Sequence, residues 1–134
     1  DNNGCVFLTD SKDEIVRKFK RAITDSEAAV YYDPENKKGI SNLMSIYSAV
    51  TGKNFDEIAA EFAGKGYGDF KLAVAEVVCD RLMPIQEKAN ALLSDKAYLE
   101  QIYAEGAAKA SALAKRTLDK VYRKVGFVAK PRLG

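Results

Sequence analysis

The stretch Asp69–Leu93 reads DFKLAVAEVVCDRLMPIQEKANALL and predicts a long helix around which the rest of the chain packs. Its apolar side chains recur at steps of three and four residues, which is the spacing of one helical face. We expect this face to be buried. It comprises Phe70, Val74, Val77, Val78, Leu82, Ile85, Ala89 and Leu92.

A second apolar stripe covers another side of this helix as far as Pro84. Polar residues replace the stripe afterwards, so we expect neighbours on most sides of the first half and on one side of the second half. Pro84 cannot donate a hydrogen bond to the carbonyl of Asp80, and its ring crowds that turn. A kinked helix is favoured over two separate helices because the first stripe passes Pro84 without a change of phase. The second stripe consists of Leu72, Ala75, Cys79 and Met83.

The composition is that of a globular chain, with 134 residues of which 47% are hydrophobic and 30% charged. No run approaches the roughly 20 uncharged apolar residues that span a bilayer, and the first residues lack the features of a signal peptide. We therefore expect a cytoplasmic protein with no membrane contact. Without histidine, and with only Cys5 and Cys79, the usual zinc sets and the Ser-His-Asp and Cys-His pairs cannot form. We predict no metal site and two reduced thiols rather than a disulfide.

Basic residues concentrate near the C-terminal end, although the whole chain has a formal charge of only +2. From Lys109 onward, eight basic residues stand against a single acid, Asp119. A solvated helix face and a surface that binds a polyanion are equally open interpretations of such a block. The eight are Lys109, Lys115, Arg116, Lys120, Arg123, Lys124, Lys130 and Arg132.

The first elements in the chain are a short apolar run and a basic helix. Cys5–Leu8 has extended character. Ser11 and Glu14 have the spacing of a capping box, which predicts a helix from there to about Ile23. Its inner face is predicted to carry Ile15, Val16, Phe19, Ala22 and Ile23, and its outer face a basic cluster of Arg17, Lys18, Lys20 and Arg21.

Residues 24–39 break the helical period and predict a loop whose length is typical of functional or mobile segments. We expect Gly39 to adopt the left-handed conformation that reverses the chain. Ser41 is then expected to cap a helix that Gly52 ends.

Asn54, with Glu57 three residues later, predicts a short helix that Gly64 stops. Gly64-Lys65-Gly66-Tyr67-Gly68 follows, directly before the long helix. A glycine-rich turn at a helix N-terminus can cradle phosphate. A tight turn between helices is favoured here, because no strand precedes it and Asp69 places a negative charge at the cap.

Ser94 is expected to cap a last helix of about thirty residues that ends near Gly126. Gly106 costs about 1 kcal/mol relative to alanine inside a helix, and close packing against another helix would explain it. Small neighbours would allow that approach; they are Ala107, Ala110 and Ala114. The predicted buried side comprises Tyr98, Leu99, Ile102, Tyr103, Ala110, Leu113, Thr117, Leu118, Val121 and Val125.

Together these elements predict an all-α fold, a bundle of about five helices around the long Pro-kinked helix. A short extended segment precedes the bundle at the N-terminus.

Three stretches in combination resemble the C-terminal part of bacterial tryptophanyl-tRNA synthetases. They are residues 1–10 (DNNGCVFLTD), residues 24–43 (TDS, then YDPENKKGISNL) and residues 64–71 (GKGYGDFK). Residues 105–127 fit as well, so the resemblance covers nearly the whole chain. Each stretch alone would be a weak signal.

The resemblance implies a class I aminoacyl-tRNA synthetase, a homodimer in which a Rossmann-type domain activates tryptophan with ATP and transfers it to tRNA-Trp. In that family the helical C-terminal domain contacts the anticodon end. The family's nucleotide-binding signature is absent here, and its Met-Ser-Lys-Ser loop ends where Asp1 begins. We therefore expect ATP and magnesium only in a catalytic domain that this chain lacks.

On the same resemblance, residues 1–10 correspond to the link from the catalytic domain and residues 11–134 to the helical anticodon-binding domain. We expect this fragment to be monomeric, with no catalytic residue and no cofactor of its own.

RNA affinity comes from lysine and arginine at phosphates, and base recognition comes from stacking and hydrogen bonds. Thr24, Asp25 and Ser26 offer donors and acceptors for a base edge, and Tyr31 and Tyr32 offer stacking faces. Two plainer interpretations stay open, that Asp25 or Ser26 caps a turn and that the tyrosines are core. The candidate phosphate ligands are Arg17, Lys18, Lys20, Arg21, Lys115, Arg116, Lys120, Arg123 and Lys124.

A different class of protein also fits these residues. The chain would then be a free-standing helical scaffold, or a protein-interaction module, whose basic face is merely solvated or docks an acidic protein.

Overall fold

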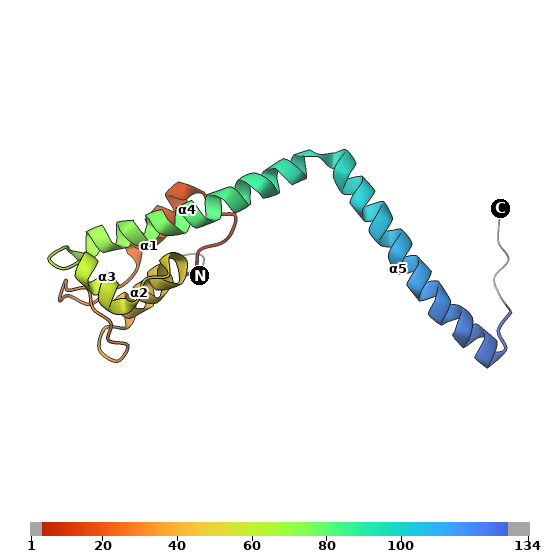
Figure 1. Ribbon diagram of the computed structural model, residues 1–134, viewed down its shortest axis with the longest axis horizontal. Helices are drawn as coiled ribbons and strands as arrows, with labels where there is room; N and C mark the ends of the chain where they lie inside the picture. The colour runs from red at the N-terminus through yellow and green to blue at the C-terminus, as the bar shows by residue number, and fades with distance from the viewer. Residues whose placement is uncertain (1–3, 129–134) are drawn as a thin grey trace. The chain divides into compact units, whose positions relative to one another are not determined.

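The computed structural model describes residues 4–128, which contain five helices and no strand. The all-α prediction is therefore confirmed. The helices are α1 (Lys12–Arg21), α2 (Lys38–Thr51), α3 (Phe55–Glu61), α4 (Tyr67–Ser94) and α5 (Lys96–Val125), as Figure 1 shows.

The chain divides into two compact units, Asp1–Lys88 and Ala89–Gly134, and each is described by itself. The expected boundary at residue 10 stays a prediction. Lys130 and Arg132 of the basic block lie outside the described residues. Within residues 4–128, no helix combines the length and apolar character needed to cross a membrane.

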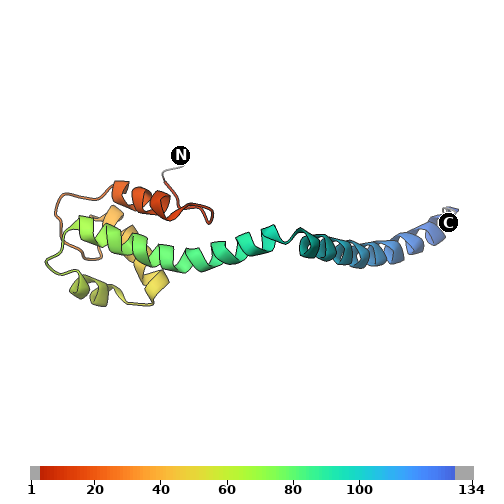
Figure 2. The ribbon, with the colours of Figure 1, turned by 90° about the horizontal axis from the view of Figure 1, so that it is seen from above.

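The first half of α4 is the centre of the first unit. In Figure 2 it runs between α1 on one side and α3 on the other, and α2 crosses behind it in this view. Phe70, Val74 and Ala75 are fully buried, which confirms that this half packs into the core, but Leu72 of the second stripe is 37% exposed, so its expected burial is wrong. Cys79 is also buried there, and burial raises the pKa of its thiol. The other helices contribute Ile15, Phe19, Ile40, Leu43, Met44, Tyr47, Ile58 and Phe62 to the same core.

α4 continues through Pro84 without a break, which confirms one helix rather than two. The bend expected at Pro84 stays a prediction. The expected burial of the second half is wrong, because Ile85, Ala89 and Leu92 are exposed. In the first unit the side-chain amide of Gln86 donates to the carbonyls of residues 8 and 10, at 2.8 Å each, so the N-terminal segment meets α4 there through polar contacts.

The N-terminal segment contains a turn rather than a strand. The N–H of Asp10 donates to the carbonyl of Phe7 at 3.1 Å, and the N–H of Phe7 donates back to the Asp10 carboxylate at 2.8 Å. Val6 packs against the core while Phe7 and Leu8 are exposed, and Cys5 is an exposed free thiol.

Both predicted capping boxes are present. In α1 the Glu14 N–H donates to the Ser11 hydroxyl, and in α3 the Glu57 N–H donates to the Asn54 side chain at 2.9 Å. Gly52 ends α2 with φ of 78°, as expected for a left-handed helix cap.

Three helix starts differ from the predictions. α2 begins at Lys38, since the Ser41 hydroxyl accepts the N–H of Asp33 at 2.9 Å from the preceding loop. α4 begins two residues early, at Tyr67. Asp95, rather than Ser94, caps α5 by accepting the N–H of Tyr98.

The end of α1 and the start of α2 meet closely. α1 ends at Arg21, and Ile23 is 90% exposed rather than turned inward, because the chain leaves the helix at Ala22. Gly39 is helical and not left-handed, so that prediction is wrong. Its role is steric, because a Cβ on Gly39 would overlap the carbonyl oxygen of Ile23.

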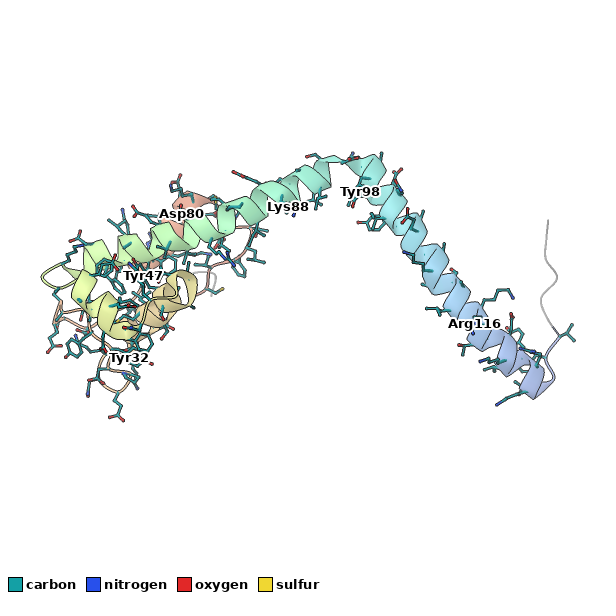
Figure 3. All side chains as sticks on the ribbon, in the orientation of Figure 1. Tyr32, Tyr47, Asp80, Lys88, Tyr98 and Arg116 are labelled. Atoms are coloured by element: carbon teal, nitrogen blue, oxygen red, sulfur yellow. The ribbon has the colours of Figure 1, made fainter. Side chains whose placement is uncertain are left out.

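α5 forms as predicted and ends at Gly126 with φ of 76°. Its expected burial is wrong, since no residue of α5 is buried and Tyr98, for example, is 45% exposed (Figure 3). Apart from the adjoining turns of α5 itself, no described atom lies within 4 Å of a Cβ built on Gly106, so the expected close helix contact is absent there. The reason is that residues 89–128, the described part of this unit, contain only the end of α4 and α5, without a further helix to cover the apolar stripe.

Replacing Gly39 by alanine is expected to destabilise the first unit, because the new methyl group would meet a backbone carbonyl that cannot rotate aside. Overpacking of this kind costs on the order of 1–3 kcal/mol. The midpoint of urea denaturation, followed by circular dichroism, should fall. Gly68→Ala is the matched control, since Gly68 is also the second residue of its helix but has open space around it. Equal midpoints for the two variants would contradict the steric role of Gly39.

Candidate nucleic-acid interface

The second half of α1 carries a cluster of exposed positive charge. Arg17, Lys20 and Arg21 are exposed, as predicted. The cations of the last turn and the acids Asp13 and Glu14 of the first turn both complement the helix dipole. Within the described part of the chain, no carboxylate forms an ion pair with these three cations, so their charge is available to a ligand.

Lys18 does not belong to this exposed cluster, so its predicted place on the outer face is wrong. Its ammonium lies 2.6 Å from the Asp10 carboxylate, and both side chains are at least nine-tenths buried. It also lies 4.7 Å from the centre of the Phe7 ring. The Lys18 hydrogen bond, with the Phe7 N–H, lowers the pKa of Asp10. Lys18 therefore ties the N-terminal turn to α1.

The segment that follows α1, residues 22–37, is irregular and is attached at both ends. Lys71 of α4 donates to the carbonyl of Ala22 at 2.7 Å and so caps the end of α1. At the far end, the Asp33 carboxylate accepts the N–H groups of Glu35 and Asn36, and the N–H of Lys37 donates to the carbonyl of Asp33 at 2.8 Å. The start and the end of this loop are thereby held by neighbouring helices and by a tight turn.

Lys37 holds the middle of the loop. Its side chain is 3% exposed, and its ammonium lies 2.7 Å from Glu27 Oε2 and 3.1 Å from Asp25 Oδ1. It also lies 2.7 Å from the Tyr67 hydroxyl and 3.1 Å from the carbonyl of Ala29. The Tyr67 hydroxyl in turn donates to Asp25 Oδ1 at 2.5 Å. Tyr67, at the start of α4, and Lys37, just before α2, thus contact each other and both bind Asp25 of the loop.

These contacts stabilise the charged forms of Asp25, Glu27 and Lys37, whereas burial and the Asp25 hydrogen bond raise the pKa of the Tyr67 hydroxyl and keep it neutral. The Tyr67 hydrogen bond, with those from the Glu27 N–H and from Lys37, lowers the pKa of Asp25 to about 2. Burial alone would lower the pKa of Lys37, but its hydrogen bonds to Glu27, Tyr67 and Asp25 raise it above the ordinary value. Asp25, Glu27 and Lys37 therefore stay ionised at neutral pH, and we call these three residues with Tyr67 the Lys37 cluster.

The three predicted base-contacting residues have different surroundings. Asp25 belongs to the Lys37 cluster, and its Oδ1 also accepts the N–H of Glu27 at 3.0 Å, so the interpretation of Asp25 as a turn cap is confirmed. Ser26 is exposed and Thr24 is half-buried. Contact of any of the three with a base stays a prediction.

The two tyrosines of the loop are not core residues, because Tyr31 is 41% and Tyr32 is 40% exposed. Tyr32 stacks face to face on Phe55 of α3, with ring centres 3.9 Å apart and planes 5° apart. The Tyr31 ring lies 4.4 Å from the Lys37 ammonium, and its hydroxyl donates to Glu27 at 2.9 Å. Each ring is therefore oriented by the protein while part of it still faces solvent.

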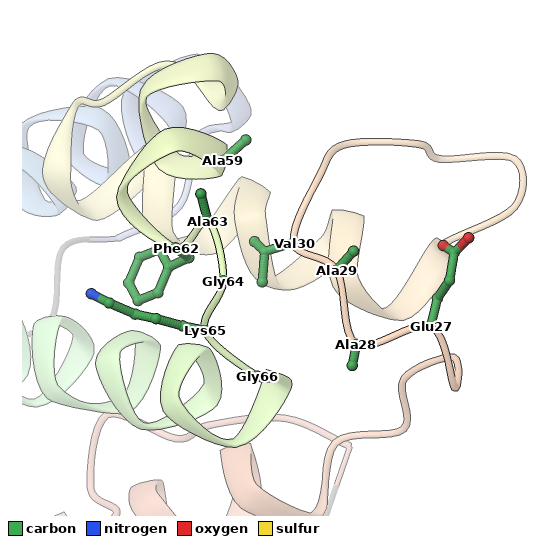
Figure 4. Close-up of a pocket in the computed structure, with 10 residues that line it drawn as sticks. All are labelled: Glu27, Ala28, Ala29, Val30, Ala59, Phe62, Ala63, Gly64, Lys65 and Gly66. Atoms are coloured by element: carbon green, nitrogen blue, oxygen red, sulfur yellow. The ribbon is translucent and has the colours of Figure 1, made fainter.

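Two hollows adjoin this loop. One, of about 460 Å³, has polar walls that include Asp25, Ser26 and Asn36. The other, of about 410 Å³, lies between the loop and the Gly64–Gly66 turn, with Val30 and Phe62 among its lining residues (Figure 4). The glycine-rich turn thus forms a wall of an open hollow as well as the predicted link between helices.

In the second unit, α5 carries a separate basic surface. Arg116, Lys120, Arg123 and Lys124 are exposed and recur at steps of three and four, so they share one face of the helix (Arg116 is labelled in Figure 3). Lys115 lies off this face, and its ammonium pairs with Asp119 at 2.8 Å. Of the five candidate phosphate ligands predicted on α5, four therefore share one face, whereas Lys115 pairs within its own helix.

The chain is similar in sequence to a known family of proteins. Residues 1–83 match the family described as tRNA synthetases class I (W and Y). The chain belongs to this family, which confirms the resemblance inferred from its residues.

Individual relatives narrow the likeness to the tryptophan branch. The chain is 46% identical to the tryptophan–tRNA ligase of Clostridium tetani over 94% of its own length, and 46% identical to that of Leifsonia xyli over 96%. It spans only 37% and 38% of those two relatives. The crystal structure of the Mycoplasma pneumoniae tryptophanyl-tRNA synthetase is 26% identical, with a TM-score of 0.67 over 96% of this chain and 39% of that one.

Sequence reasoning missed the residues that shape the loop, namely Lys37, Tyr67 and Lys71. Lys37 looked like one of two lysines in a turn, and Tyr67 like part of a glycine-rich link. The available signal was helical spacing, because Tyr67 and Lys71 share a face with the core residues Phe70 and Val74.

Replacing Asp25 by asparagine is expected to reduce stability at neutral pH, because Lys37 loses an ionic partner. A carboxylate whose pKa is depressed in the folded state contributes stability above its unfolded pKa and loses it as pH falls through the folded pKa. The relevant window runs from the ordinary value of 3.8 down to about 2. The difference in urea midpoint between the unaltered chain and Asp25→Asn should therefore shrink across that window. A difference that stays constant there would contradict the depressed pKa of Asp25.

Proposed function

We propose that this chain is the anticodon-binding part of a tryptophan–tRNA ligase. The observation that carries the proposal is the likeness to tryptophan–tRNA ligases over nearly the whole chain, which aligns with their C-terminal part. The whole enzyme would join tryptophan to tRNA-Trp with ATP and magnesium in its catalytic domain, act as a homodimer and work in the cytoplasm. This chain alone would be monomeric and would bind RNA without catalysing the reaction.

The charge distribution supports the RNA-binding role. Arg17, Lys20 and Arg21 present three cations that form no ion pair with a carboxylate of residues 4–128, beside a loop with two half-exposed tyrosines. Cations of this kind bind phosphates, and aromatic rings bind unstacked bases. The basic face of α5 offers a second set of phosphate ligands in its own unit, with the same chemistry.

The polar groups of the loop would read bases rather than phosphates. Ser26 is exposed and carries a hydroxyl that can both donate and accept. Asp25 is the less accessible of the two, because its Oδ1 is held by Lys37 and Tyr67 and its Oδ2 is buried, with no hydrogen-bond partner among the described residues. Lys18 is left out of the proposed interface because its charge is paired internally with Asp10.

The proposal predicts a salt-dependent affinity for the anticodon stem-loop of tRNA-Trp. In a titration at several salt concentrations, replacing Arg17 or Arg21 by glutamine should weaken binding. Each lost phosphate contact should also reduce the slope of log K against log salt by about 0.7 to 0.9.

Lys12→Gln is the matched control, because Lys12 is an exposed cation at the opposite end of α1. It should leave the slope nearly unchanged. Binding indifferent to salt, or equal effects of Lys12→Gln and Arg17→Gln, would count against an RNA interface and favour a scaffold with a solvated basic face.

A further inference from the structure

Ala28 marks a strained point in the loop between α1 and α2. Its φ is 60°, and among the described residues it is the only non-glycine with positive φ. A side chain makes this left-handed conformation costly, so it persists only where surrounding contacts hold it. Ala28 itself is exposed, so burial of its methyl group does not supply that hold.

Lys37 holds the residues on both sides of Ala28. Its ammonium contacts Glu27 Oε2 at 2.7 Å and the carbonyl of Ala29 at 3.1 Å. The backbone of Lys37 is itself fixed, since its carbonyl accepts the N–H of Ser41 in the first turn of α2 at 2.9 Å. The strained residue is therefore spanned by one side chain that is anchored on a helix.

The Lys37 ammonium has no capacity left for an RNA phosphate. A lysine has three N–H donors, and here four acceptors lie within hydrogen-bond distance. The side chain is also 3% exposed. Whatever Lys37 contributes to binding must act through the shape of the loop.

We propose that Lys37 is a positioning residue, which fixes the strained loop in its binding shape before RNA arrives. This inference rests on the proposed RNA-binding function. The Lys37 ammonium contacts the Tyr31 ring at 4.4 Å and so orients it, and the exposed Ser26 lies between Asp25 and Glu27, which Lys37 binds. It also sets the 27–30 wall of the hollow opposite the Gly64–Gly66 turn (Figure 4). A loop that is already ordered avoids the entropy cost of ordering on contact.

The test uses Lys37→Met in the full chain, with Lys38→Met as the matched control. Lys38 is the next residue and is exposed, so both variants remove one positive charge at the start of α2. If only about a tenth of the Lys37→Met molecules keep the loop competent, affinity for the anticodon stem-loop falls about tenfold. The slope against salt stays that of the unaltered chain, because no phosphate contact is lost.

A second readout needs no RNA. The amides of Glu27 and Asp33, which are hydrogen bonded to Asp25 and Ser41, should exchange with solvent faster in Lys37→Met than in Lys38→Met, while core amides of α4 stay protected. Adding Ala28→Gly to Lys37→Met should recover part of the affinity, because glycine adopts positive φ without strain. A general loss of stability would not produce this combination.

If Lys37→Met does not fold, Ala28→Val provides a second test of whether the shape of the loop controls RNA binding. A β-branched residue strains the left-handed conformation while leaving the Lys37 cluster in place. It should weaken RNA binding without changing the salt slope.

The outcomes separate this inference from the function on which it rests. If the unaltered chain does not bind the stem-loop, the proposed function fails and the inference falls with it. If the unaltered chain binds but Lys37→Met loosens the loop with no loss of affinity, the positioning role is overturned while the function stands. A reduced salt slope in Lys37→Met would also overturn the inference, because it would make Lys37 a phosphate ligand.

Discussion

Burial of one face of the first half of α4 is the constraint on which the first unit depends. Phe70 and Val74 are fully buried and lie one turn apart, and the other three helices of the unit supply the remaining core around them. Tyr67 and Lys71 extend the same face with polar groups, and they reach the loop and the end of α1. Apolar burial places the helix, and the polar ends of that face then set the path of the segment between α1 and α2.

Two buried lysines play a related part at separate places in the first unit. Lys18 joins α1 to the N-terminal turn through Asp10, and Lys37 joins α2 to the loop through Asp25 and Glu27. Such pairs contribute little net stability, because removing two charges from water costs about as much as their attraction returns. Removing one partner alone is strongly destabilising, because it leaves an unpaired charge in the interior. A conformation that separates the partners is therefore disfavoured, and the chain is held in the one that keeps them together.

The separation between paired and unpaired cations also defines the proposed RNA surface. On α1, Lys18 points inward to Asp10 while Arg17 and Arg21 remain exposed. On α5, Lys115 pairs with Asp119 while the other predicted cations share one face. The number of basic residues therefore overstates the positive charge available to a polyanion. Lys18 and Lys115 are paired with carboxylates, and the other candidate cations are the ones that can bind it.

Local signals in the sequence were reliable where the responsible groups are neighbours in the chain. The capping boxes at Ser11 and Asn54, the glycine ends of α2 and α5, and the buried stripe of early α4 follow from spacing alone, since each depends on residues within about one turn. Family membership also followed from the residues, because motifs along nearly the whole chain agreed with each other.

What the sequence by itself determined is the helical class, the two capping boxes, the glycine ends of α2 and α5, and the family. Only the tertiary structure decided that Lys18 and Lys37 are buried, that Gly39 serves a close backbone approach and that the apolar stripes of late α4 and α5 stay exposed. The physical reason is distance along the chain. Helix periodicity reports which residues share a face, but Tyr67 reaches Asp25 across 42 residues, and whether a face is covered depends on packing that no local pattern encodes.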